Sequence, residues 1–192
     1  MSKEDIEKKD HRNKVIMSIV LAVIMLFSTA GYFVMDFSSQ KANSLEYNGV
    51  KFTQNEYGLW AANINGVAYQ TLFNPKETKN ISVNIMSNLY AYTNQPIYFS
   101  GEPIEEIPGS GVQEILRNIG SVVVRSNYAC LEEDCSMDYV IKNCTNDNII
   151  IFKESQNNQT SITQNERCVN IIYAQGELER ASDAFLFKIL GI

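Results

Sequence analysis

Hydrophobic and polar residues alternate with a period of two along three stretches in the first half of the chain. The stretches are residues 45–53, 57–64 and 67–73. This period is typical of strands that bury one face. Asn65 and Gly66 separate the last two stretches, and this dipeptide favours the type I′ turn of a two-residue hairpin. The pattern therefore predicts an antiparallel β-meander, with Trp60 packed inside it rather than stacked on a ligand.

Two later stretches have the period of an amphipathic helix. Their apolar positions are Val112, Ile115, Leu116 and Ile119 in the first stretch, and Leu178, Ala181, Phe185 and Ile189 in the second. Ser110 and Gln113 have the spacing of a capping box, and Gly120 and Gly191 stand where a helix commonly ends. We therefore expect two short helices, one in the second half of the chain and one at its C-terminus.

Runs rich in β-branched residues flank these helices. They are residues 97–100, 121–125, 148–153 and 168–174, whereas residues 81–92 fit neither period. The strand, helix and strand between residues 97 and 125 predict one parallel crossover, which requires a mixed sheet beside the meander. The expected fold class is α+β, and residues 45–192 have the usual size of one domain.

The N-terminal region carries a candidate membrane anchor. Residues 15–35 contain no charged side chain, and a helix over them, at about 1.5 Å per residue, covers the roughly 30 Å hydrocarbon layer of a bilayer. Five basic residues precede this run: Lys3, Lys8, Lys9, Arg12 and Lys14. This bias predicts that residues 1–14 form a cytoplasmic tail. Residues 36–44 are then a linker, and residues 45–192 form a domain outside the cell membrane. The alternative is a signal peptide cleaved near residues 28–30, which places the domain on the same side.

The charge of the expected external domain limits its partners. Five of the 16 basic and five of the 22 acidic residues lie within residues 1–37, which leaves 11 basic against 17 acidic residues in the remainder. Nucleic acids and anionic lipid headgroups bind through excess lysine and arginine, so we expect neither to bind this domain. The expected partners are the membrane, through the N-terminal helix, and another protein of the cell envelope.

Candidate catalytic residues are few. The single histidine, His11, precedes the predicted anchor, so the domain has none for a hydrolase triad, a zinc site or a proton shuttle. Two clusters of acid remain: Glu102, Glu105 and Glu106, and Glu132, Glu133 and Asp134. Paired carboxylates can hydrolyse glycosides or bind calcium, but neither cluster has the ligand spacing of a calcium loop. We interpret both as solvated loops, and we predict no catalytic residue, no metal ligand and no cofactor.

The cysteines are Cys130, Cys135, Cys144 and Cys168, separated by four, eight and 23 residues. The spacing lacks the two close pairs of a structural zinc site, and it lacks the C-x-x-C of a thiol oxidoreductase. Outside the cytoplasm, an even number of cysteines favours disulfides over bound zinc or free thiols.

The favoured disulfides are Cys130 to Cys135 and Cys144 to Cys168. The first pair brackets a short loop that can close by itself, and the second follows by elimination. Cys144 and Cys168 each precede a predicted strand, so parallel strands would bring them side by side within disulfide reach. Antiparallel strands would separate them by several residues at about 3.3 Å each, and Cys144 would then pair with Cys130 or Cys135.

Taken together, the hydrophobic N-terminus, the segments NGVKF and YGLWAANINGVAY, the cysteine segment, NERCVNI and the terminal SDAFLFKILGI resemble uncharacterised families of small membrane-anchored archaeal proteins. The resemblance implies an extracytoplasmic cysteine-containing domain and no known activity. Type IV pilins share the plan of a hydrophobic helix before a β-rich domain, but their glycine-ended leader and the glutamate that follows it do not occur here. We expect a structural or protein-interaction role at the envelope rather than an enzyme. The alternative is a carboxylate-dependent hydrolase of sugars or cell-wall polymer.

Overall fold

The computed structural model describes residues 15–25, 43–133 and 135–192. It divides the chain into two compact units, Met1–Ala42 and Asn43–Ile192. Residues 15–25, in the first unit, are helical. The helices in the described ranges are all too short or too polar to cross a membrane. The predicted tail, the rest of the predicted span and residues 36–42 of the predicted linker lie outside the described residues.

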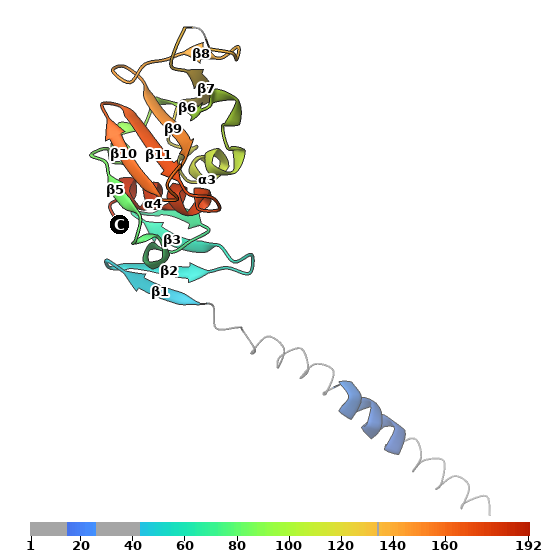
Figure 1. Ribbon diagram of the computed structural model, residues 1–192. Helices are drawn as coiled ribbons and strands as arrows, with labels where there is room; N and C mark the ends of the chain where they lie inside the picture. Colours follow the sequence, from blue (N-terminus) through green and yellow to red (C-terminus); the bar gives the residue numbers. More distant parts are fainter. Residues whose placement is uncertain (1–14, 26–42, 134) are drawn as a thin grey trace, which may run out of the picture. The chain divides into compact units, whose positions relative to one another are not determined.

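The second unit begins with the expected antiparallel meander (Figure 1). Its strands are β1 (Ser44–Tyr47), β2 (Val50–Gln54), β3 (Trp60–Ile64) and β4 (Val67–Thr71), and they pair in that order. The turn at Asn65 and Gly66 is confirmed, because both residues have the positive φ that a type I′ turn requires, 53° and 84°. The single strand expected over residues 45–53 is wrong. Asn48 and Gly49 have φ of 48° and 78° and form a further hairpin between β1 and β2.

The remaining strands form one mixed sheet. They are β5 (Ser82–Asn84), β6 (Pro96–Glu102), β7 (Arg125–Cys130), β8 (Val140–Ile141), β9 (Asn148–Glu154), β10 (Ser161–Asn165) and β11 (Cys168–Tyr173). They lie in the order β5-β10-β11-β9-β6-β7-β8. The β10–β11 pair is antiparallel, and the other five pairs are parallel. The α+β class and the predicted mixed sheet are therefore confirmed, although the sequence did not indicate β5, β8 or β10.

The parallel crossover from β6 to β7 runs through α3 (Gly109–Ile119). The strand predicted at residues 121–125 is wrong, because the chain still turns there. The amides of Val122 and Val123 both donate to Ile119 O, at 3.0 and 3.3 Å, and β7 begins only at Arg125. The capping box predicted at Ser110 is also wrong, because α3 follows Pro108 and has no side-chain cap. Gly120 has a right-handed φ of −58° rather than a left-handed one.

Short helices occupy the connections that the sequence left undefined. The helix α2 (Pro75–Thr78) has a capping box in which Asn74 accepts from the Glu77 amide and the Glu77 side chain accepts from Asn74 N. One 3₁₀ turn, η1 (Leu89–Ala91), lies within residues 81–92, and a second, η2 (Ile104–Glu106), follows β6. These turns are single and local, so they produce no periodic pattern in the sequence.

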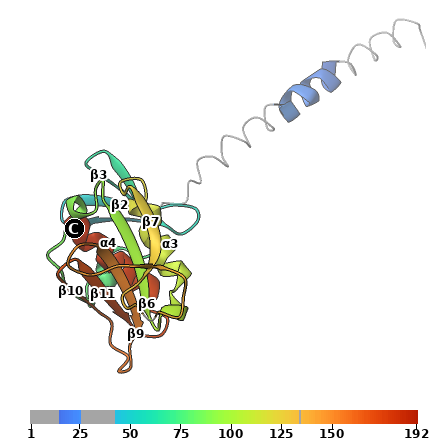
Figure 2. The same cartoon turned by 90° about the horizontal axis from the view of Figure 1, so that it is seen from above.

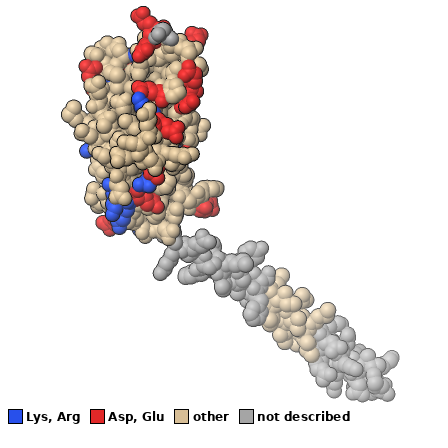
Figure 3. All heavy atoms as spheres, viewed as in Figure 1, with Lys and Arg blue, Asp and Glu red and all other residues tan. Residues whose placement is uncertain are grey.

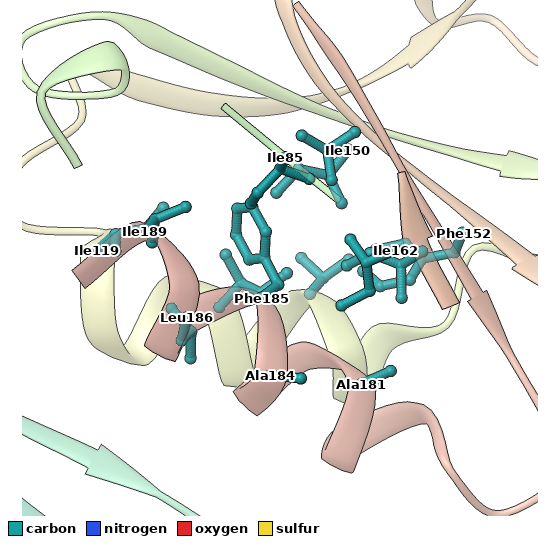
Figure 4. Packing of buried hydrophobic residues seen from close by; sticks show 14 of the residues in the cluster. Ile85, Ile119, Ile150, Phe152, Ile162, Ala181, Ala184, Phe185, Leu186 and Ile189 are labelled. Carbon is teal, nitrogen blue, oxygen red and sulfur yellow. The ribbon is translucent and has the colours of Figure 1, made fainter. Parts of the chain in front are cut away.

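The closing helix, α4 (Leu178–Leu190), ends as predicted at Gly191, whose φ is 77°. It packs against β5, β10 and β11 of the mixed sheet and against α3 (Figures 1 and 2). Phe185 reaches from α4 toward Ile85 and Ile150 in the main core (Figure 4). On the other side of α4, Phe187 packs edge-on against Phe52 of the meander, with ring centroids 5.9 Å apart. The two helices α3 and α4 are therefore a middle layer between the two sheets.

Candidate functional site

All four cysteines are bonded, and the pairing is the one predicted. Cys130 joins Cys135 with their Cα atoms 5.9 Å apart, and Cys144 joins Cys168 with their Cα atoms 5.0 Å apart. The parallel pairing of β9 with β11, in which Cys168 lies opposite Ile149, confirms the reasoning behind the second pair. Arg167 also positions it, because its amide donates to Cys144 O at 2.9 Å.

The two disulfides enclose the segment that connects β7 to β9, and this segment covers the face of the mixed sheet opposite the helices. Tyr98, Ala129, Ile149, Ile151 and Cys168 form a second buried cluster there, and Leu131 and Cys144 of the segment pack against it. The segment has little regular structure, with only the two-residue strand β8 in it. Its position therefore depends on these apolar contacts and on the two disulfides.

A polar contact fixes the same segment to β6 and β7. Tyr98 is 1% exposed, its hydroxyl accepts from Arg125 Nη2 at 3.3 Å, and Lys142 Nζ lies 4.6 Å from the centroid of its ring. Lys142 also pairs with Asp147 at 3.1 Å. Burial alone would raise the pKa of Tyr98, but the hydrogen bonds and positive charges of Arg125 and Lys142 lower it. These contacts join β6, β7 and the segment that contains Lys142, so we interpret this group as structural.

An open cleft of about 440 Å³ lies at the carboxyl ends of β6 and β7. It is lined by residues 100–105, by residues 130–132 and by residues 135 and 136. The carboxyl ends of adjacent parallel strands are a common place for ligands, because the loops that leave them diverge. The Cys130–Cys135 disulfide forms part of the lining and closes the loop after β7 on itself. A hydrogen bond from Ser136 to Glu105 joins this loop to the turn after β6.

Three carboxylates line this cleft: Glu102, Glu105 and Glu132. Glu102 pairs with Lys153 of β9 at 2.6 Å, and both side chains are about half exposed, at 47% and 46%. Ser136 donates a short hydrogen bond to Glu105 Oε1, which lowers the pKa of the Glu105 carboxyl. Acidic side chains gather over the end of the domain that holds β7 and β8 (Figure 3). The cleft therefore presents negative charge at neutral pH.

The two acidic clusters that the sequence suggested as separate solvated loops thus meet at one cleft. Glu102 and Glu105 come from the first cluster and Glu132 from the second, whereas Glu106 and Glu133 are not among the lining residues and Asp134 lies outside the described ones. The sequence did not predict this shared cleft, because the strand after α3 was expected at residues 121–125, whereas β7 runs from Arg125 to Cys130. A strand ending at Cys130 would have put both clusters directly after adjacent parallel strands.

The cleft can attract cations, but its acids are not arranged as a metal centre. Within residues 43–133 and 135–192, no three side chains of aspartate, glutamate, histidine or cysteine are grouped so that they could hold a metal ion. An ionised carboxylate beside a hydroxyl and an apolar wall, here Leu131 and Ile104, suits an ammonium or guanidinium group with an aliphatic stem.

Comparison with protein families, with curated proteins and with solved structures finds no significant match to this chain.

Proposed function

We propose that the chain is a single-pass membrane protein whose domain, residues 43–192, lies outside the cytoplasm and binds another protein of the cell envelope. Two disulfides support an oxidising compartment, because such bonds persist outside the reducing cytosol. The resemblance to uncharacterised archaeal membrane-anchored families belongs to the same proposal. We further propose that the N-terminal hydrophobic run anchors the chain, with its basic flank in the cytoplasm.

The acidic cleft is the observation on which the binding role rests. Glu102, Glu105 and Glu132 converge there from two segments of the chain. A disulfide closes one of these segments, and the hydrogen bond from Ser136 to Glu105 joins the two. A preformed cleft with ionised carboxylates favours a partner that presents lysine or arginine, since complementary charge gives specificity and fast association. We therefore propose a basic, exposed segment of an envelope protein as the ligand.

A binding measurement tests this role. The double variant E105Q/E132Q removes two negative charges from the cleft, and E46Q/E56Q removes the same charge from exposed positions of the meander region. A lysine- and arginine-rich peptide is titrated against the full chain at low and physiological salt. Exposed ion pairs are weak and screened by salt, so E105Q/E132Q should weaken Kd by roughly 2- to 30-fold, most at low salt, while E46Q/E56Q changes little. Equal losses in both double variants, or no binding by the unmodified chain, would refute the cleft as the site.

A hydrolase is the second candidate, and one observation favours it. Carboxylates from two different segments line one cleft, as two-carboxylate glycosidases require. Such an enzyme also needs a general acid with a raised pKa, whereas the pKa of Glu105 is lowered and Glu102 is paired with Lys153. Release of sugar from cell-wall polymer by the unmodified chain, and its loss in E132Q, would replace the binding role with this one.

A further inference from the structure

A second pair of acids lies in the interior, away from the cleft. Glu114 of α3 is 1% exposed and Asp183 of α4 is 0% exposed, so neither side chain contacts water. The two side chains face each other between the helices. A carboxylate this deeply buried is costly unless it is paired or protonated. Neither acid belongs to the apolar stripe of its helix, and the proposed binding role uses neither.

Each carboxyl has one oxygen with a clear partner and one without. Asp183 Oδ2 accepts from the amide of Phe73 at 2.8 Å, just beyond β4, and Glu114 Oε2 accepts from Arg117 at 2.7 Å. Glu114 Oε1 and Asp183 Oδ1 are buried and lack any other partner. The two side chains interact directly. A single proton between Oδ1 and Oε1 would satisfy both remaining atoms, because a protonated carboxyl donates where an ionised one can only accept.

We propose that Glu114 and Asp183 share one proton and form a pH-sensitive latch that holds the meander against the helical layer. The latch consists of this carboxyl pair together with the Phe73 amide that Asp183 binds. Beside it, Asn118 of α3 exchanges two hydrogen bonds of 2.8 Å with the backbone of Gln70 in β4. The pair therefore lies where α3, α4 and the end of the meander meet, and the loss of its proton places two repelling charges at that junction.

Arg117 is the charged group that contacts the pair from α3, and it compensates one negative charge only. On α4, Arg180 Nη1 pairs with Glu177 at 2.9 Å, and Arg180 Nε is buried without a partner. On α2, Glu77 binds the Asn74 amide, and Lys76 is exposed. None of these cations is among the groups that shift the pKa of Asp183, so they do not offset its charge. Burial, followed by the charge of Glu114, raises the pKa of Asp183 from 3.8 to about 9.

The direction of the pH effect follows from this shift. In the unfolded chain Asp183 ionises near pH 3.8, whereas in the folded chain it keeps its proton to about pH 9. Between these values the folded chain binds more protons than the unfolded chain, so stability falls as pH rises. The ratio of folded to unfolded molecules should fall by up to tenfold per pH unit across this window. The latch therefore holds the meander against the helical layer at acidic pH and weakens at alkaline pH.

The test compares D183N with E46Q in the full chain, with both disulfides intact. In D183N the amide oxygen can still accept from Phe73 and the amide nitrogen can donate to Glu114, so the variant imitates the protonated pair without titrating. E46Q removes one exposed carboxylate from β1 of the meander, and Glu46 is not among the groups that shift the pKa of Asp183. Urea unfolding between pH 5 and 9 is followed by the fluorescence of Trp60, the only tryptophan, which lies in the meander. We expect the pH slope to persist in E46Q and to be largely lost in D183N.

Two further measurements keep the latch testable if D183N does not fold. The ¹³C resonance of the Asp183 carboxyl in the unmodified chain should show a protonated acid at pH 6. Exchange of the Phe73 amide should accelerate with pH more than the intrinsic rate of exchange does. An ionised Asp183 at pH 6, equal pH slopes in D183N and E46Q, or stabilisation at pH 8 by an added divalent cation would each overturn the shared proton.

Discussion

The Cys144–Cys168 disulfide should stabilise the domain more than the Cys130–Cys135 disulfide, because it closes a longer loop. The sequence separations are 24 and five residues. In the chain-entropy description, a cross-link stabilises by restricting the unfolded chain, and the effect grows with the logarithm of loop length. These lengths correspond to about 3.5 kcal/mol for the longer loop and about 2.2 kcal/mol for the shorter. Either value is a large part of the roughly 5 to 15 kcal/mol that stabilises a typical domain.

Two double variants separate the contributions. In C130A/C135A, reduction opens only the Cys144–Cys168 bond, and in C144A/C168A it opens only the Cys130–Cys135 bond. Comparing each variant with its own reduced form removes the cost of deleting a sulfur atom, which matters because Cys168 is 1% exposed. The free energy of unfolding is measured in urea for oxidised and reduced samples of the full chain, with Trp60 fluorescence as the signal.

The expected loss on reduction is about 3.5 kcal/mol in C130A/C135A and about 2.2 kcal/mol in C144A/C168A. The order of the two losses is the sharper result, since it depends on loop length and not on the absolute scale. A larger loss for the short loop would refute the loop-length argument. It would mean that the folded-state contacts of the cleft, rather than the entropy of the unfolded chain, determine what the disulfides contribute.

Two shorter predictions concern the meander and the topology. G66V should lower the free energy of unfolding by about 1 to 2 kcal/mol, because Gly66 has a φ of 84° that a β-branched residue resists, while no atom lies within 4 Å of an added Cβ. An unchanged melting temperature would refute a structural role for this turn; G109A, at the start of α3, is the control. Protease added to intact cells should remove the domain at residues 43–192 and spare the N-terminal tail. Protection of the domain until lysis would contradict the proposed anchoring.

The sequence predicted best those elements whose pattern is local. The Asn65–Gly66 turn and the end of α4 at Gly191 both have short, unambiguous signals, and both are confirmed. The disulfide pairing was also predictable, because Cys130 and Cys135 bracket a short loop and the second pair follows by elimination; the parallel pairing of β9 with β11 that it requires is confirmed. By contrast, the β-branched residues Val122 and Val123 lie in a turn and pack partly against the main core. Their hydrophobic character therefore indicated burial and not a strand.

Two buried polar residues of α3 show what hydrophobic periodicity cannot predict. Glu114 and Asn118 lie four residues apart on α3, beside the apolar stripe, where a helix on the surface would expose them. They are buried, at 1% and 5% exposure, because Glu114 faces Asp183 of α4 and Asn118 binds Gln70 of the meander. Periodicity predicts which side of a helix is apolar, but it does not reveal a polar side that is covered as well. Only the positions of α4 and the meander against α3 make these residues interior.

The connection from β6 to β7 relates the cleft to this interior. It leaves β6 at Glu102, forms one wall of the cleft through Glu105 and then enters α3. A Cβ atom on Gly111 would lie 2.9 Å from Leu178 Cδ1 and 3.0 Å from Phe152 Cε1, so glycine is what lets α3 approach both α4 and β9. Because α3 is packed this closely on two sides, it cannot slide without losing contacts in the main core. The position of the Glu105 wall therefore depends on how α3 packs, whereas the disulfide shapes the opposite wall, the loop after β7.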